Sequence, residues 1–300
     1  MSIYREKIEM MRNTELSKYM KIAIEEAGIS LREGNKGFGA VVVKNGTIIS
    51  RAHDTEVTDN DPTSHAEINA IKKAASQIGK DLSGCLMIST HEPCPMCSIA
   101  IVWAGLPELA YGFSIEDAIK QGRNRIDISC AEMFSRAKVN ITVHKGVLKS
   151  ECSILYDRSV RKNIKELKDA GPKALKELEQ TLLKKRVDWF ERNSHRFNST
   201  PDDLENAYKL LLEKLEITPD QAPIVIKERN KIVFHSRNFC PTLEACKILG
   251  LDTREICKKV SQNPTNELLR KLNPKLRFDR NYKNLRPYTE YCEEMIMLKG

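Results

Sequence analysis

A chain of 300 residues, 41% of them hydrophobic and 30% charged, indicates a globular protein with one large or two ordinary domains. No run of 18 apolar residues is present, which argues against a transmembrane helix. Charged residues are scattered through the first 20 positions, where a signal peptide would need an apolar stretch, so we expect a cytoplasmic protein. The net charge of +8 divides into +1 for residues 1–150 and +7 for residues 151–300, so the second half has either a solvated basic surface or an anionic partner.

The first half alternates helical and extended patterns. Apolar residues at helical spacing predict a helix over 13–34, and Asn45-Gly46 between two apolar runs predicts a hairpin over 39–52. A helix follows His65, another begins near Cys94, and the apolar segments 83–90, 108–114 and 139–148 are expected strands. This alternation predicts a three-layer α/β domain over residues 1–156, with its later strands parallel.

The pattern changes after about Tyr156. Residues 157–200 are highly charged and helical, with an interruption at Gly171-Pro172, and predict a helical connector. Beyond it, the sequence predicts a helix over 201–217, a hairpin over 222–236, and two helices separated by a break over 242–260. We therefore expect residues 201–300 to form an accessory α+β module.

One set of residues in the first half has the side chains and spacing of a candidate metal site. His65 opens a helix in "PTSHAEINAIKKAA", and Cys94 and Cys97 open another in "EPCPMCSIAIVWAG". One imidazole and two thiolates are a plausible three-ligand zinc set that leaves a fourth tetrahedral position open. Glu67 lies two residues beyond the histidine and is the candidate proton carrier. A closed structural zinc site, a redox pair and inert core thiols are the alternatives.

The motifs "HAE" and "EPCPMC" resemble the zinc-dependent cytidine-deaminase-like superfamily, over residues 15–150. The resemblance implies a mixed five-stranded sheet and a hydrolase that replaces an exocyclic amine by water. It also implies one Zn²⁺ per chain held by His65, Cys94 and Cys97, with Glu67 moving the proton, as is typical of zinc deaminases with this signature. Members of the superfamily form dimers or tetramers, so we expect a homo-oligomer, most simply a dimer.

The guanine deaminase and tRNA adenosine deaminase branches share "DPTxHAE" and "EPCPMC" and are the nearest in pattern. Both branches usually have asparagine eleven residues before the motif histidine, where this chain has Asp54. An ionised carboxylate only accepts hydrogen bonds, so Asp54 favours a ring edge rich in N–H, such as a cyclic amidine or guanidine, unless it is a turn residue. Trp103 either lies under a base or is ordinary core. Further candidate substrate contacts are Phe38, Ala66, His91 and Asn124.

The expected function is deamination of a free nucleobase or related amino-heterocycle. The alternatives are an RNA adenosine deaminase that holds RNA with its basic second half, and a non-catalytic sensor or scaffold. Basic and aromatic residues alternate over 273–291, but a packed C-terminal extension is favoured there over an RNA grip because no RNA-binding motif is visible. A second metal site, less favoured than core cysteines, would use His235, Cys240, Cys246, Cys257 and Cys292.

Overall fold

The computed structural model describes residues 2–197 and 203–299, with side chains from Arg12 onward. The chain forms two compact units, Met1–Arg161 and Lys162–Gly300, and each is described by itself. Across the described residues, we find no helix with the length and apolar character needed to span a bilayer.

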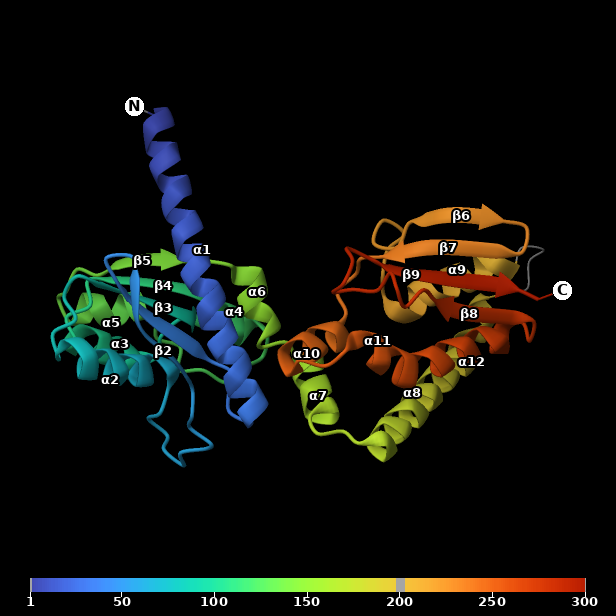
Figure 1. Ribbon diagram of the computed structural model, residues 1–300, viewed down its shortest axis with the longest axis horizontal. Coiled ribbons are helices and arrows are strands. Elements are labelled where there is room, and N and C mark those ends of the chain that lie inside the picture. Colours follow the sequence, from blue (N-terminus) through green and yellow to red (C-terminus); the bar gives the residue numbers. More distant parts are fainter. Residues whose placement is uncertain (1, 198–202, 300) are drawn as a thin grey trace. The chain divides into compact units, whose positions relative to one another are not determined.

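The first unit is built on one five-stranded sheet with helices packed on it (Figure 1). The strand order is β2-β1-β3-β4-β5; β1 is antiparallel to both neighbours, whereas β3, β4 and β5 are mutually parallel. The mixed five-stranded sheet expected from the sequence is therefore confirmed. Its elements are α1 (Ser2–Glu33), β1 (Gly39–Lys44), β2 (Thr47–His53), α2 (Ala66–Ile78), β3 (Cys85–His91), α3 (Pro95–Trp103), β4 (Glu108–Phe113), α4 (Ile115–Lys120), α5 (Cys130–Arg136), β5 (Thr142–Lys145), α6 (Lys149–Ile154) and the start of α7 (Arg158–Leu167).

Strand β1 separates two helical layers because its side chains alternate between the faces of the sheet. Ala40 and Val42 belong to a buried cluster that includes Ala70 of α2. Gly39 points the other way, where α1 comes so close that an added Cβ would lie 1.9 Å from the carbonyl oxygen of Ala23. The sheet thus has α1 on one face and α2 on the other.

The turn between β1 and β2 is the tight hairpin that the sequence indicates. Asn45 and Gly46 both have positive φ, 48° and 76°, which is the backbone that an Asn-Gly hairpin turn requires. The pairing then runs from Lys44 opposite Thr47 to Gly39 opposite His53. This register leads the chain from the end of β2 directly to Asp54.

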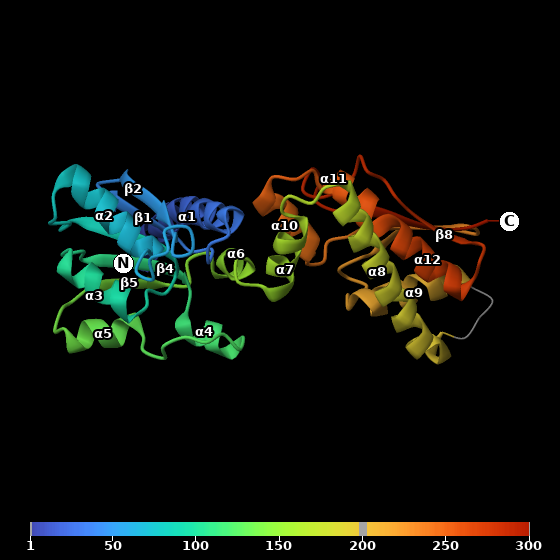
Figure 2. The ribbon, with the colours of Figure 1, turned by 90° about the horizontal axis from the view of Figure 1, so that it is seen from below.

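The second unit is a four-stranded antiparallel sheet in the order β6-β7-β9-β8, with helices packed against it (Figure 2). Its core combines Leu211 of α9, Phe234 of β7, Leu268 of α12 and Ile296 of β9. Its elements are the remainder of α7, α8 (Pro172–Asn193), a 3₁₀ turn (Ser194–Arg196), α9 (Asp203–Leu215), β6 (Ile224–Glu228), β7 (Lys231–Ser236), α10 (Pro241–Leu249), α11 (Thr253–Ile256), a π-helical turn (Cys257–Ser261), α12 (Gln262–Leu272), β8 (Leu276–Arg280) and β9 (Cys292–Leu298). The α+β character expected for the C-terminal part is confirmed.

Two segments of this unit have structure that the sequence analysis did not specify. Helix α8, expected in a connector, packs on α12, where buried Arg186 donates hydrogen bonds to Thr265 and to the Ser261 carbonyl; residues 198–200 of that connector lie outside the described residues. The segment 273–291 contains strand β8, and β9 follows it, so this part of the chain builds the sheet.

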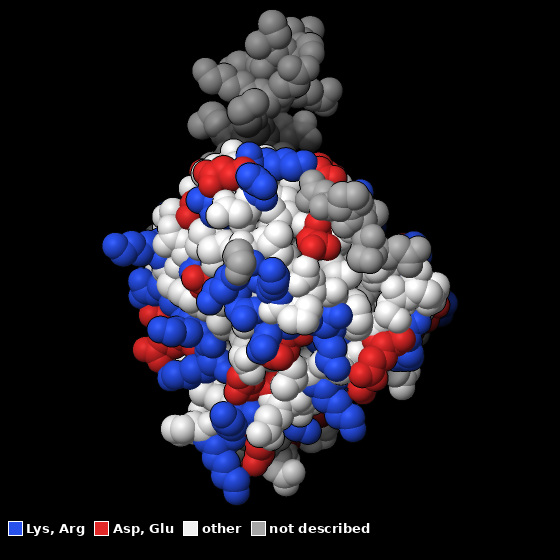
Figure 3. All heavy atoms as spheres, turned by 90° about the vertical axis from the view of Figure 1, so that its right-hand side faces the viewer, with Lys and Arg blue, Asp and Glu red and all other residues white. Residues whose placement is uncertain are grey.

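The surface of the second unit is basic but not uniformly so. Figure 3 faces this unit and shows more lysine and arginine than acidic side chains, with acidic groups between them. This agrees with the net charge of +7 for residues 151–300.

Candidate active site

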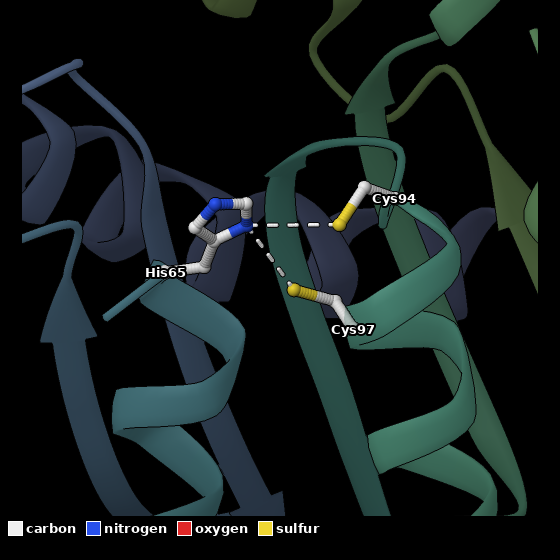
Figure 4. A group of neighbouring side chains, drawn as sticks. All are labelled: His65, Cys94 and Cys97. Atoms are coloured by element: carbon white, nitrogen blue, oxygen red, sulfur yellow. Dashed lines mark hydrogen bonds between the residues drawn. The ribbon is translucent and has the colours of Figure 1, made fainter. Parts of the chain in front are cut away.

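Three of the predicted site residues meet at the starts of two helices of the first unit. His65 is the N-cap of α2, Cys94 is the N-cap of α3, and Cys97 lies in the first turn of α3. Nδ1 of His65 lies 3.6 Å from Sγ of Cys94 and 3.5 Å from Sγ of Cys97 (Figure 4). The three donor atoms all point into one space.

Local sequence explains why α3 begins where it does. Strand β3 ends at His91, and Pro95 at the first helical position has the φ that a helix needs and no N–H to leave unpaired. The hydroxyl of Ser98 donates to the carbonyl of Pro93, and its N–H donates to the carbonyl of Cys94. These bonds fix the loop that presents the first cysteine.

The spacing of the donor atoms fits a zinc ion. Tetrahedral geometry with Zn–N of about 2.0 Å and Zn–S of about 2.3 Å places nitrogen and sulfur roughly 3.5 Å apart. The two observed separations between His65 and the cysteines, 3.6 and 3.5 Å, are of that size. Within the described residues, these three side chains form a group whose ligand atoms lie within 4.8 Å of one another.

Glu67 lies beside this group and is buried. Its Oε1 accepts a hydrogen bond of 2.9 Å from the hydroxyl of Ser89 on β3. Burial first, and then the negative charge of Cys94, raise the pKa of Glu67. A raised pKa makes the carboxylate of Glu67 a stronger proton acceptor, which suits a proton carrier.

A cavity of about 100 Å³ adjoins these groups. It is smaller than the pockets that hold drug-sized ligands, so it has room for a single ring system at most. Of the residues expected from the sequence, Phe38, His65, Glu67, His91 and Cys94 line it. The lining is completed by residues that the sequence analysis did not single out as contacts: Lys36, Glu92, Ile115, Arg125 and Ile126.

Asp54 is fully buried next to this cavity. Its Oδ1 accepts a hydrogen bond from the N–H of Lys36, whereas Oδ2 has no hydrogen-bond partner among the described residues. A carboxylate oxygen of Asp54 lies within 4.8 Å of a ring nitrogen of His65. Burial raises the pKa of Asp54.

His91 has one free acceptor. Its Nδ1 lies 2.9 Å from the carbonyl oxygen of Glu92 and must be the protonated nitrogen, so Nε2 is the acceptor, and it has no partner among the described residues. The ring packs edge-on against Phe38, Phe113 and Tyr156, and burial lowers the pKa of His91 to about 4. The imidazole is therefore neutral.

Three expected substrate contacts lie elsewhere. Trp103 is at the far end of α3 from the cysteines and is 84% exposed, so neither the base platform nor the core position fits. Ala66 is buried among the core side chains of α2. Asn124 is exposed, and the next residue, Arg125, lines the cavity in its place. None of these three side chains lines the cavity.

Glu92 is a wall residue that the sequence could have indicated, since it precedes Cys94 by two positions. Its two carboxylate oxygens accept hydrogen bonds of 3.0 Å from the N–H groups of Ile115 and Cys130. Because these groups start α4 and α5, Glu92 ties both helices to the end of β3.

Within the described residues, the side chains proposed for a second metal site are not grouped as metal ligands. His235 stacks on Tyr291 with 3.7 Å between ring centroids. In the described part of the chain, no three of His235, Cys240, Cys246, Cys257 and Cys292 bring ligand atoms within 4.8 Å of one another. Burial raises the pKa of Cys246 and Cys257 to about 11 and about 12, as for core thiols.

Comparison with known proteins agrees with this geometry. Residues 13–113 match the family model of the cytidine and deoxycytidylate deaminase zinc-binding region. The chain is 40% identical over 114 residues to guanine deaminase from Bacillus subtilis, covering 38% of this chain and 71% of that protein. It is 33% identical over 165 residues to the tRNA-specific adenosine deaminase of the same organism, covering 55% and 99%.

A solved structure from work on A-to-I editing by tRNA:A34 deaminases covers 46% of this chain and 98% of its own, with 29% identity and a TM-score of 0.40. From the matched sequences, this chain belongs to the zinc-dependent deaminases of the cytidine-deaminase-like family, hydrolases that act on C–N bonds.

Proposed function

We propose that this protein hydrolytically deaminates a nucleobase-like ring that carries an exocyclic amine, with one Zn²⁺ per chain. The observation that supports this most directly is the meeting of Glu67 with His65, Cys94 and Cys97 at a cavity of about 100 Å³. A single ring fits such a space. Zn²⁺ held by the histidine and the two cysteines would supply Lewis acidity that makes water a nucleophile near neutral pH.

The residues of the chain account for the proton transfers. Glu67 takes one proton from the attacking water and passes it to the ring nitrogen, and it then moves the remaining hydroxyl proton to the exocyclic nitrogen as the C–N bond breaks. The water oxygen remains on the ring carbon as a carbonyl, and ammonia leaves. Ser89 holds the carboxyl group in place through its 2.9 Å hydrogen bond.

One buried acceptor in the cavity wall and one beside the cavity favour a ring edge rich in N–H groups. Asp54 Oδ2 and His91 Nε2 are buried acceptors without partners among the described residues. A buried acceptor left unpaired costs roughly 1–3 kcal/mol, so a ligand that donates to it is favoured. Amidine- or guanidine-like edges, as in guanine, carry such donors.

An ammonia-release screen over nucleobases, nucleosides, pterins, triazines and cyclic guanidines tests the proposal. We expect turnover of at least one member, and Glu67→Ala should abolish it while the zinc content stays near one per chain. Asp54→Asn should shift preference among the substrates. If zinc-loaded protein releases no ammonia from any of these compounds, deamination of a small ring is contradicted. If Asp54→Asn ranks the substrates in the same order as wild type, Asp54 does not take part in substrate recognition.

The second candidate function is deamination of adenosine in RNA. Two observations favour it: the match over 99% of a tRNA-specific adenosine deaminase, and the basic face of the second unit (Figure 3). If this candidate holds, ammonia release requires a folded RNA substrate, and removing residues 162–300 weakens RNA binding more than base turnover. A kcat/KM that is higher for free bases than for folded RNA would contradict this second candidate function.

We also propose that the protein is a homo-oligomer, most simply a dimer. Trp103 exposes 84% of its surface on α3, which is unusual for tryptophan in a monomer. Light scattering after size exclusion measures the mass directly. We expect Trp103→Glu to shift it toward the monomer, and a monomeric wild type contradicts the proposal.

A further inference from the structure

Three arginines gather at the rim of the active-site cavity on two neighbouring aromatic rings. The guanidinium carbons of Arg123 and Arg161 lie 5.3 and 5.6 Å from the ring centroid of Tyr156. That of Arg125 lies 5.5 Å from the centroid of Phe38, whose ring is 5.4 Å from that of Tyr156. We call Arg123, Arg125 and Arg161 the arginine cluster.

The cluster has no neutralising acid. Among the described residues, none of its three guanidinium groups has a carboxylate oxygen within 4 Å. The nearby cation Lys36 is already paired, with Glu56. Asp54 is the acid that acts on Arg161 from a distance. Cation–π contacts hold the side chains but leave their positive charge in place.

This concentration of charge is unusual in its setting. Residues 1–161, with 21 Lys+Arg and 20 Asp+Glu, have a net charge of only +1, so no general excess of basic residues accounts for three arginines at one rim. Burial first, and then the charges of Arg161 and Arg125, lower the pKa of Arg123 to about 10. Like charges held together at a half-buried site repel one another unless an anion binds between them.

The position of the cluster fixes what that anion is attached to. Arg125 and Phe38 both line the cavity, and Arg161 donates a 2.5 Å hydrogen bond to the carbonyl of Lys36, which also lines it. A ring fills the cavity of about 100 Å³, so any charged substituent of the ring must lie outside, at the rim. Guanidinium groups bind phosphate oxygens in paired hydrogen bonds.

We propose that the arginine cluster is a phosphate subsite and that the ring deaminated here carries a phosphate, as in a nucleoside monophosphate. This rests on the proposed deaminase function and replaces the free base expected from the sequence by a base that carries a sugar phosphate. A single mononucleotide is favoured over a polynucleotide because the first unit has this local cluster without a general basic surplus.

The test compares matched substrates. For each base that is turned over, kcat/KM is measured for the base, the nucleoside and the nucleoside 5′-monophosphate with zinc-loaded protein. We expect the monophosphate to exceed the nucleoside by about tenfold or more, which corresponds to ~1.4 kcal/mol. The variant Arg123→Gln/Arg125→Gln should remove this preference, and Arg136→Gln on α5, an exposed arginine paired with Glu132, should retain it.

Replacing Arg123 and Arg125 should disturb the fold less than replacing Arg161. Arg161 also donates to the carbonyls of Leu155 and Lys36, whereas Arg123 and Arg125 make no such long-range backbone bonds in the described structure. Calorimetric binding of inorganic phosphate gives a readout independent of turnover. We expect binding to wild type and Arg136→Gln, and binding at least tenfold weaker in the double variant.

The outcomes separate the two proposals. Ammonia release from bases or nucleosides without phosphate preference, and with equal phosphate binding in wild type and double variant, overturns the subsite but leaves the deaminase function. Phosphate binding that depends on the cluster, with no ammonia from any compound, overturns the function but leaves the subsite. If a hexanucleotide binds more tightly than the mononucleotide, the arginine cluster binds a phosphate of an RNA chain. That result would contradict the proposal that the substrate is a mononucleotide.

Discussion

The hydroxyl of Ser89 donates a 2.9 Å hydrogen bond to Oε1 of Glu67, joining β3 to the first turn of α2. We expect Ser89→Ala to lower kcat by about tenfold, because the carboxyl group loses its orientation, and to leave zinc content unchanged. The bond also lowers the pKa of Glu67 against the larger effect of burial. Its loss should therefore move the acid limb of the kcat profile to higher pH.

Ser50→Ala is the matched control for this change. Ser50 is a buried serine of the same sheet whose hydroxyl donates to the carbonyl of Ala70 instead of to a carboxylate. It should affect stability without moving the pH profile. An unmoved profile in Ser89→Ala assigns the serine a structural role only.

Zinc content provides a second prediction. Cys97→Ala should lower bound zinc from about one per chain to near zero, because a pair of ligands holds the ion far more weakly than three. Cys246→Ala removes a buried cysteine of the second unit and should leave zinc content unchanged. Atomic emission on purified protein measures both, and loss of zinc in the Cys246 variant would restore the second metal site to consideration.

The helices that carry the site could be predicted from the sequence because their signals are local. His65 and Cys94 are helix N-caps in the positions that the motif spacing indicates, and Asn45-Gly46 forms the expected turn. The arginine cluster could not be predicted, since it arises when the loop with Arg123 and the start of α7 meet on one tyrosine ring. Such contacts depend on packing between segments far apart in the chain.

Strands β8 and β9 were missed for a physical reason. The core-facing positions of β9 include Glu294, which is buried and pairs with Arg280 of β8 at 2.7 Å and with Ser236 at 2.6 Å. A charged residue at an inward position breaks the apolar alternation that identifies a strand. Only the neighbouring strand supplies the partner that makes its burial possible.

The contacts of His53 predict a pH-dependent stability. Its Nδ1 lies 2.8 Å from Glu26 and its Nε2 lies 3.0 Å from Glu33, so only the protonated ring can donate to both, while Arg51 also binds Glu26. The hydrogen bond to Glu26 chiefly raises the pKa of His53. A raised folded-state pKa gives stability that is fully present below about pH 6.5 and lost as pH rises through the folded value.

His53→Gln should therefore destabilise the first unit most near pH 6, by about 1 kcal/mol, and progressively less toward pH 9. Chemical unfolding at pH 6 and pH 9 measures the free energy of unfolding of the wild type and of the variant. The difference between the two proteins is then compared between the two pH values. An equal loss of stability at the two pH values would mean that the ring acts through packing alone.

Two glycines of the first unit predict opposite effects of the same substitution. At Gly39 an added Cβ would lie 1.9 Å from the carbonyl oxygen of Ala23 and 2.6 Å from the N–H nitrogen of Ala27, both backbone atoms of α1. At Gly28, within α1, the nearest atom is the side-chain end of Arg32 at 3.6 Å, which is ordinary contact.

Gly28→Ala should raise the free energy of unfolding by about 0.5–1 kcal/mol, since alanine favours the helix. Gly39→Ala must push α1 away from β1 and should cost at least ~3 kcal/mol, because the atoms in the way are backbone atoms and not the flexible end of a side chain. Gly39 also follows Phe38, a wall of the cavity, so the displacement should raise KM in any protein that remains folded. Thermal unfolding and KM measured on both variants check this, and a Gly39→Ala protein as stable as wild type contradicts the close approach of α1 to β1.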